Sequence, residues 1–322
     1  MTIFNQDRTY NVLKFSKLFI LMSLTFVAIS WGLTAIKGMT FGIDFAGGTV
    51  VQVKYAKAAP LKEIRDVLAN SKFNKASIQE FGSLEEIIIK IPTASHDLNQ
   101  DIGDDIRGIL QNTPAHEIRR VDIVGPKVGN ELRVKGVYAL AVALIGILLY
   151  VSFRFEWRFA LAAIFALVHD ISLVIGVIVL VKVDVNLDIL AGLLTILGYS
   201  LNDTIVVFDR IRESLMKSKE VNLNDVINEA ISRTLSRTTL TSLTTFFVVL
   251  TLYLFGGELI NGLSFTLLIC VVVGTYSSIF IAAKMLQILG FSVNNYRQKL
   301  ATKEANNREK DRLRSMYEQG TM

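Results

Sequence analysis

The chain has 322 residues, of which 51% are hydrophobic, and it carries a formal net charge of +5. Its apolar residues are gathered in six long blocks, which indicates that the chain is a polytopic helical membrane protein and not a wholly soluble one. One cysteine and three scattered histidines exclude a disulfide framework and argue against a metal site. No GxxxxGK(S/T) motif occurs, so we expect no ATP hydrolysis by this chain, no enzymatic chemistry and no cofactor.

The six apolar blocks predict six transmembrane helices, because about 20 residues at 1.5 Å each cross the roughly 30 Å hydrocarbon core of a bilayer. The first block is longer than the core of a signal peptide and lacks a small-residue cleavage site at its end. We therefore expect it to remain as an anchor. The predicted spans are Leu18–Ile36, Val134–Phe153, Phe159–Val181, Ile189–Phe208, Leu240–Phe255 and Gly262–Ala283.

Lys and Arg residues cluster at alternate ends of these spans, so the positive-inside rule predicts that both termini are cytoplasmic. We attribute the positive net charge to this topology and not to nucleic-acid binding. In chain order, the expected parts are a cytoplasmic N-terminus (1–17), the first span (18–36), an extracytoplasmic head domain (37–133), a five-helix bundle (134–283) with a cytoplasmic loop at about 209–237, and a cytoplasmic tail (284–322).

The head domain is predicted to be a small α+β domain with the β-α-β-β-α-β order of ferredoxin-like folds. Alternating apolar and polar residues predict its strands, and a 3.6-residue apolar period predicts its helices. The elements are strand 49–55, a helix opened by Pro60, strands 77–81 and 86–91, helix 97–110 and strand 116–124. Four acidic residues of the second helix are expected to form a solvated face and not a cation site; they are Asp97, Asp101, Asp104 and Asp105.

Glycine-rich segments lie at both junctions between the head domain and the membrane. Gly47 and Gly48 precede the first strand, and Gly125 and Pro126 follow the last one. Glycine permits backbone angles that are closed to other residues, so both segments are hinge candidates. The segment before the first strand lacks the GxGxxG spacing of a nucleotide-binding loop.

His169 and Asp170 are adjacent in the third span. A buried His–Asp pair can be inert, each side chain satisfying the other, or it can belong to a proton relay. Both interpretations remain open.

Asp203 is an ionisable residue inside the fourth span, and the candidate relay residue Asn202 precedes it. A charge at this depth costs roughly 2.5–3.5 kcal/mol on insertion scales, so ion or proton handling is the favoured interpretation. The alternatives are a position in the headgroup region or a structural pair. Arg237 lies at the inner end of the fifth span and could pair with this carboxylate.

Polar residues on the fourth and fifth spans predict a hydrophilic seam between these two helices. The alternative is that the hydroxyl groups bond the preceding helix turn and permit close packing. The residues of this predicted seam are Thr195, Tyr199 and Asn202 on the fourth span and Thr234, Arg237, Thr241 and Thr244 on the fifth. Between the two spans, Val221–Ile231 is expected to form an amphipathic helix with Asn222 or Asn224 as its cap.

Six segments occur in a specific order along the chain. They are GIDFAGGT (42–49), VGPKVGNEL (124–132), HD (169–170), GYSLNDTIVVFDRIRE (198–213), SRTLSRTTLTSLTT (232–245) and VVGTYSS (272–278). This ordered set resembles the SecF branch of the SecD/SecF family of bacterial protein-export subunits, which are relatives of the RND exporters. With the six spans and the one outer domain, the resemblance covers nearly the whole chain.

The resemblance implies a subunit of the bacterial inner membrane that pairs with SecD and associates with the SecYEG channel and YajC, while SecA supplies ATP hydrolysis. Such complexes use the proton motive force to move exported, unfolded polypeptides late in translocation. The proton-handling carboxylate of the family maps to Asp203 and its arginine to Arg237. The competing functions are a scaffold for the channel and a small-molecule proton antiporter of the RND type.

Overall fold

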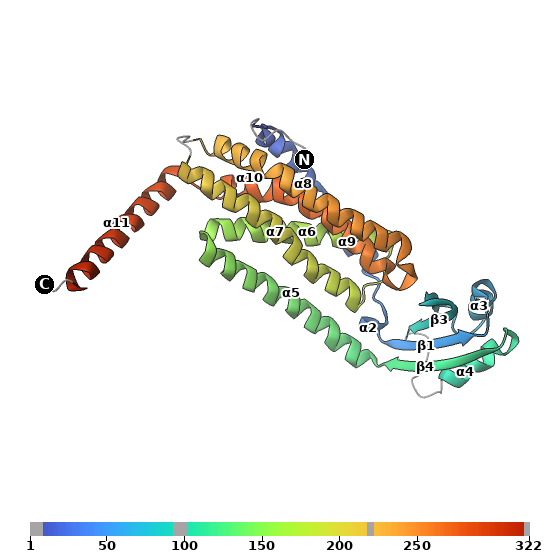
Figure 1. Ribbon diagram of the computed structural model, residues 1–322. Coiled ribbons are helices and arrows are strands. Elements are labelled where there is room, and N and C mark those ends of the chain that lie inside the picture. Colours follow the sequence, from blue (N-terminus) through green and yellow to red (C-terminus); the bar gives the residue numbers. More distant parts are fainter. Residues whose placement is uncertain (1–8, 93–101, 218–221, 319–322) are drawn as a thin grey trace.

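The computed structural model describes residues 9–92, 102–217 and 222–318 (Figure 1). In this part of the chain, six helices are long and apolar enough to cross a membrane, as the six apolar blocks predicted. They are α1 (Ser16–Lys37), α5 (Pro126–Arg154), α6 (Trp157–Val181), α7 (Leu187–Lys217), α8 (Leu223–Phe255) and α9 (Gly257–Ser277), which continues through a π-helical turn (Ser278–Ala282) into α10 (Ala283–Ile288).

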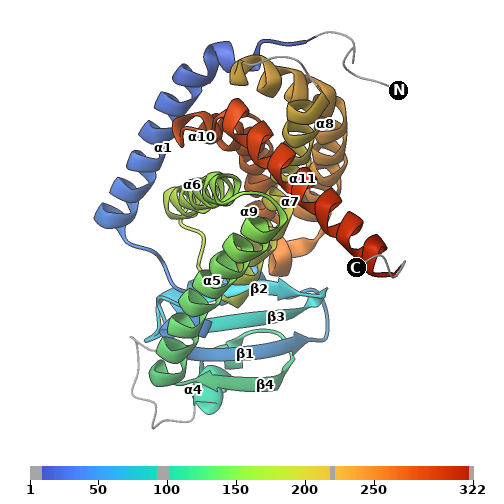
Figure 2. The same ribbon diagram turned by 90° about the vertical axis from the view of Figure 1, so that its left-hand side faces the viewer.

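Helices α6, α7 and α9 form the centre of the bundle, and α1, α5 and α8 lie around them (Figure 2). The outer helices expose large apolar side chains such as Leu21, Val142 and Val248. These surfaces have the chemistry of lipid-facing or partner-facing helices. The central helices, by contrast, bury both apolar and polar side chains.

Small residues allow the closest helix contacts in the bundle. A Cβ atom built on Gly176 of α6 would lie 2.1 Å from Ser30 Oγ of α1, so only glycine permits this approach. In α9, Gly274 faces Ser200 of α7, with 3.2 Å between its built Cβ and Ser200 Cβ. These contacts hold α1, α6, α7 and α9 together without large side chains.

The predicted cytoplasmic loop at 209–237 is wrong in its described residues, because the two helices continue through it. Helix α7 extends to Lys217 and α8 begins at Leu223, so the expected amphipathic helix is the first part of α8. The cap prediction is confirmed, since Asn222 Oδ1 accepts a hydrogen bond from Asn224 N. The first turns of α8 pack into the apolar core through Val226, Ile227 and Ala230, which explains why helix continues there. Val221 lies outside the described residues.

The head domain contains a four-stranded antiparallel sheet with the strand order β2-β3-β1-β4 (Figure 2). This order and the β-α-β-β-α-β sequence of elements confirm the ferredoxin-like prediction. The elements are β1 (Gly48–Tyr55), α3 (Leu61–Ala69), β2 (Ser77–Phe81), β3 (Ser83–Pro92), α4 (Ile102–Ile109) and β4 (His116–Val124).

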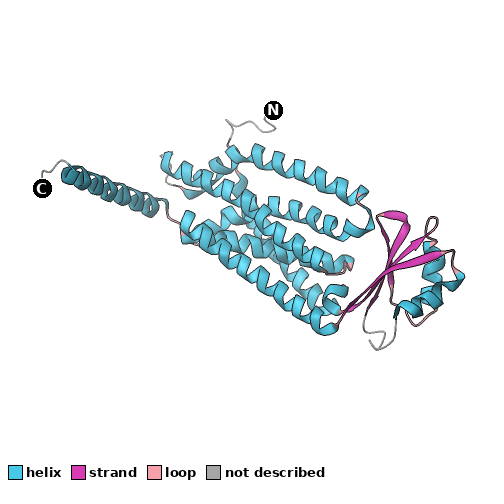
Figure 3. Cartoon of the chain, turned by 60° about the horizontal axis from the view of Figure 1, so that its bottom comes forward, coloured by secondary structure: helices cyan, strands magenta, loops and turns pink. Residues whose placement is uncertain are grey.

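The helices cover one face of this sheet (Figure 3). The core between them contains Val51 and Val53 of β1, Ile64 of α3 and Ile106 of α4. Of the predicted acidic cluster, Asp104 forms an ion pair with Arg107 and Asp105 with Lys72, as expected for a solvated face. Asp97 and Asp101 lie outside the described residues.

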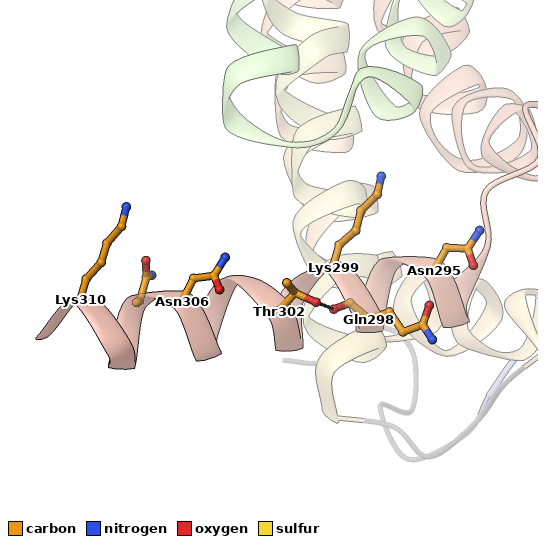
Figure 4. A pocket seen from close by; sticks show the side chains of 7 residues that line it. Asn295, Gln298, Lys299, Thr302, Asn306 and Lys310 are labelled. Carbon is orange, nitrogen blue, oxygen red and sulfur yellow. Dashed lines mark hydrogen bonds between the residues drawn. The ribbon is translucent and has the colours of Figure 1, made fainter. Parts of the chain in front are cut away.

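The polar tail forms the long helix α11 (Val293–Glu318), which projects away from the bundle (Figure 1). A row of polar side chains along this helix borders an open depression (Figure 4). Its lining residues all belong to α11, and Lys299 donates a hydrogen bond to Glu156 at the start of α6. One exposed helix face does not enclose a ligand.

Candidate functional site

The candidate carboxylate Asp203 lies on the buried face of α7, with 4% of its surface exposed. Ser200 shares this face, because residues three or four positions apart lie on one side of a helix, and Thr204 beside Asp203 is also buried. Ser242 Oγ of α8 donates a hydrogen bond to Asp203 Oδ2 over 3.3 Å. Thr275 Oγ1 of α9 lies 2.7 Å from Ser242 Oγ. Three helices therefore meet at this carboxylate through hydroxyl groups.

The direct pairing of Asp203 with Arg237 is not formed. Arg237 is exposed, and the hydrogen-bond partner of Asp203 within the described chain is Ser242. Ser242 follows Arg237 by five positions in α8. The two residues therefore lie about 7.5 Å apart along the helix axis and about 140° apart around it. Arg237 instead lines an open polar cavity with Asp209 and Arg210.

A second buried carboxylate, Asp170, has no exposed surface and accepts three hydrogen bonds. His169 Nδ1 lies 3.0 Å from Asp170 Oδ1. Ser200 Oγ of α7 and Ser277 Oγ of α9 both donate to Asp170 Oδ2, over 2.6 and 2.8 Å. The predicted His–Asp pair is thus formed, and it joins α6 to α7 and α9.

His169 itself is 8% exposed, and its Nε2 atom is buried without a hydrogen-bond partner among the described residues. The Tyr276 ring lies beside it, with 6.2 Å between ring centroids. A buried imidazole nitrogen without a partner is uncommon, because its desolvation is not compensated. This atom is available to a proton or a water molecule.

The two carboxylates belong to one polar band across the centre of the bundle. Ser200, which contacts Asp170, is one helical turn from Asp203 on α7. Ser277, which also contacts Asp170, is two residues from Thr275 on α9. A displacement of α7 against α9 therefore changes the hydrogen bonding of both acids together.

The predicted seam between the fourth and fifth spans is not formed inside this chain. Asn202, Arg237, Thr241 and Thr244 are exposed, as is Thr195. The three threonine hydroxyls bond carbonyls of their own helices, which was the alternative interpretation. The reason is the rotation of α8. It buries Thr234 of the predicted seam together with Thr238 and Ser242, and leaves the other predicted residues of α8 exposed.

Sequence reasoning did not single out the three hydroxyl residues that contact the carboxylates, Ser200, Ser242 and Ser277, nor Thr275, whose hydroxyl contacts Ser242. One signal was present, since Ser200 precedes Asp203 by three positions and therefore shares its helix face. The other three lie on different helices, and their contacts depend on how α8 and α9 are rotated.

The two glycine-rich junctions differ in structure. Gly47 has a φ of 80°, and a Cβ atom built on Gly48 would lie 2.4 Å from the Ile91 carbonyl oxygen, so both positions require glycine. Gly125 is extended, and Pro126 is the first residue of α5, where its fixed φ suits a helix start. The second span therefore begins at Pro126, inside the segment assigned to the head domain.

Two family profiles match the chain. The C-terminal profile of SecD/SecF protein export membrane proteins matches residues 106–295, and the SecD/SecF GG motif matches residues 32–59. A protein translocase subunit SecF from Helicobacter pylori is 48% identical over 321 residues, which cover 99% of both chains. The chain belongs to the SecF family. The SecF of Vibrio alginolyticus is 42% identical and is covered over 92% of its length by 89% of this chain.

Solved structures of SecDF have the same fold as this SecF-family chain. The crystal structure of SecDF from Thermus thermophilus, described as a translocon-associated membrane protein, is 32% identical with a TM-score of 0.76. SecDF in the form called super-membrane-facing is 31% identical with a TM-score of 0.68. The chain covers 39% and 40% of those SecDF chains, so it corresponds to one part of them. Family and helices together establish a multi-pass membrane protein.

Proposed function

We propose that this chain is the SecF-type subunit of an export complex in which ion transfer at Asp203 drives movement of exported, unfolded polypeptides. The complex contains a SecD-type partner and associates with the SecYEG channel and YajC, while SecA acts indirectly through ATP hydrolysis. The chain lies in the bacterial inner membrane with both termini in the cytoplasm. The observation that carries the proposal is a carboxylate that is buried in a membrane span, accepts a hydrogen bond from the Ser242 hydroxyl and has no cation in contact among the residues that the structure describes.

The physical basis is the cost of an uncompensated charge at this depth. A buried carboxylate anion is destabilised by several kcal/mol unless a cation neutralises it. Proton occupancy of Asp203 is therefore linked to the position of Arg237. Each proton that crosses the membrane supplies about 2.3 kcal/mol per 100 mV, which is comparable to that cost. Ion entry and exit can thus bias the bundle between two helix packings.

Asp170 and His169 form a second candidate proton group in the same band, and Asn202 lies next to Asp203 on its exposed side. The hydrogen bonds of Ser200 and Ser277 to Asp170 support this role, because they connect it to the helices that also surround Asp203. The glycine-rich junctions at Gly47, Gly48, Gly125 and Pro126 would carry the resulting motion to the head domain.

The docking of the SecD-type partner is supported by the exposed polar side chains of α7 and α8. Asn202, Arg237, Thr241 and Thr244 would face hydrocarbon in an isolated subunit. Polar groups at membrane depth are normally covered by another helix. We therefore place the SecD-type helices against this face.

Export of a secreted reporter in cells that carry Asp203→Asn tests the proposal. Asp188→Asn is the matched control, because it makes the same change at the exposed outer end of α7. We expect export to be lost in the first variant and retained in the second, with equal membrane levels and equal co-purification of the partner. Normal export with Asp203→Asn would indicate a scaffold instead.

A further inference from the structure

The segment between α1 and the head domain is bonded to the loop that precedes α7. Gly42 N donates to the Val185 carbonyl over 2.8 Å, and Val185 N donates to the Thr40 carbonyl over 2.8 Å. Thr40 Oγ1 also donates to the Val183 carbonyl. Segments that are 143 residues apart in the sequence are thus joined at the outer end of the bundle.

Asp44 makes the contact that matters most, because it reaches the first residue of α7. Its Oδ2 atom accepts a hydrogen bond from Leu187 N over 3.0 Å. The first N–H groups of a helix have no partner within the helix, and a carboxylate is favoured there by the helix dipole. Asn186 Oδ1 accepts from Ile189 N in the same turn. Helix α7 is therefore capped by one local residue and by one from the head-domain junction.

The element that carries Asp44 is fixed to the head domain and to α5. Asp44 belongs to the short helix α2 (Ile43–Ala46), and Gly47 alone separates α2 from β1, a central strand of the sheet. A Cβ atom built on Gly129 of α5 would lie 2.8 Å from the Phe45 carbonyl oxygen, so α5 packs directly on α2. Movement of the sheet must therefore move Asp44.

Helix α7 connects the contact at Asp44 to the candidate proton site at Asp203. Helix α7 is unbroken from Leu187 to Lys217 and contains Asp203. Asp203 follows Leu187 by 16 positions, which corresponds to about 24 Å of straight helix. We propose that Asp44 is a positioning residue that couples the head domain to α7, so that the two move as one body when Asp203 gains or loses its ion. This inference rests on the proposed function.

The first test uses export by the full chain with its SecD-type partner. Asp44→Ala removes the acceptor for Leu187 N, and loss of such a cap lowers the docked population about fivefold, so export should fall by a similar factor. Asp44→Asn keeps an acceptor oxygen and should export normally. Asp188→Ala is the matched control, since it removes an exposed carboxylate from the first turn of α7.

The second test separates coupling from a purely structural role. Spin labels at Lys62 in the head domain and Leu180 at the outer end of α6, both exposed, report the position of the head domain relative to the bundle. Asp203→Asn should change this distance distribution when Asp44 is present. In Asp44→Ala protein the same change at Asp203 should alter the distribution about fivefold less. Asp44→Glu, which keeps a carboxylate on a longer side chain, replaces the alanine variant if that variant does not assemble. In Asp44→Glu protein, Asp203→Asn should change the distance distribution about half as much as in the parent chain.

The outcomes distinguish the two proposals. If Asp203→Asn impairs export but Asp44→Ala exports normally, the coupling inference is wrong and the proposed function stands. If the head domain responds to Asp203→Asn as strongly in Asp44→Ala or Asp44→Glu protein as in the parent chain, Asp44 is a structural cap only. If Asp203→Asn itself exports normally, the proposed function fails first.

Discussion

Gly129 is the position where the structure makes the sharpest prediction about the junction of head domain and membrane. In Gly129→Ala, the added methyl group would lie 2.8 Å from the Phe45 carbonyl oxygen and 3.1 Å from Gly47 N. Both neighbours are backbone atoms, so they cannot rotate away and α5 must shift. Such overpacking costs roughly 1–3 kcal/mol.

Gly146→Ala provides the reference on the same helix. A Cβ atom built on Gly146 meets no other atom within 4 Å, so this change brings only the gain in helix propensity, about 1 kcal/mol. Gly129→Ala makes the same gain in helix propensity. The difference in the free energy of unfolding between the two variants is therefore the steric cost at Gly129. At roughly 2 °C per kcal/mol for a chain of this size, the thermal midpoints should differ by about 2–6 °C.

The assay is thermal unfolding of the purified variants in one detergent, with export of a secreted reporter measured in parallel. Gly129→Ala should unfold at the lower temperature and export less, because α2 is displaced from α5. Equal midpoints for the two variants would refute the packing of α5 on α2.

Further predictions concern the carboxylates and the head domain. Ser242→Ala removes the hydrogen-bond donor to Asp203 and should lower export several-fold. Thr241→Ala is the control, because Thr241 is exposed and bonds its own helix, and it should export normally. Equal export defects in the two variants would contradict the site. Asp170→Leu leaves the Ser200 and Ser277 hydroxyl donors without their acceptor, and each unsatisfied buried donor costs roughly 1–3 kcal/mol of stability. This variant should therefore unfold at a lower temperature than Asp170→Asn. The reverse order would contradict the hydrogen-bond network. Burial raises the pKa of Tyr55, so its contribution to stability is complete below the ordinary value near 10 and is lost as the pH rises above it. The free energy of unfolding, measured by fluorescence between pH 8 and pH 11, should therefore fall less steeply with pH for Tyr55→Phe than for the parent chain.

The sequence predicted the architecture because each element carries its own periodic signal. The alternation of Val51, Val53 and Tyr55 gave β1 almost to the residue, and six apolar blocks gave six spans. The end of α7 and the start of α8 were misplaced, since polar residues there looked like a loop. Their helical conformation depends on burial of residues such as Ile227 against other helices, and that burial is a tertiary effect.

The carboxylates of the site were predictable, but their partners were not. Asp203 and Asp170 stand out because a charge in a membrane span is costly. Whether Asp203 contacts Arg237 or Ser242 depends on the rotation of α8, and no residue pattern within α8 fixed that angle. The contact of Asp44 with Leu187 N is harder still, because it joins segments 143 residues apart through a backbone atom.

The most direct test of the central claim is the dependence of export on the proton gradient in vesicles that carry the complete complex. Export is measured with and without the gradient for the parent chain, Asp203→Asn and the control Asp188→Asn. The account predicts that the gradient-dependent part of export disappears in Asp203→Asn alone, while the part driven by ATP hydrolysis remains. A full response to the gradient in Asp203→Asn would contradict ion coupling through this carboxylate.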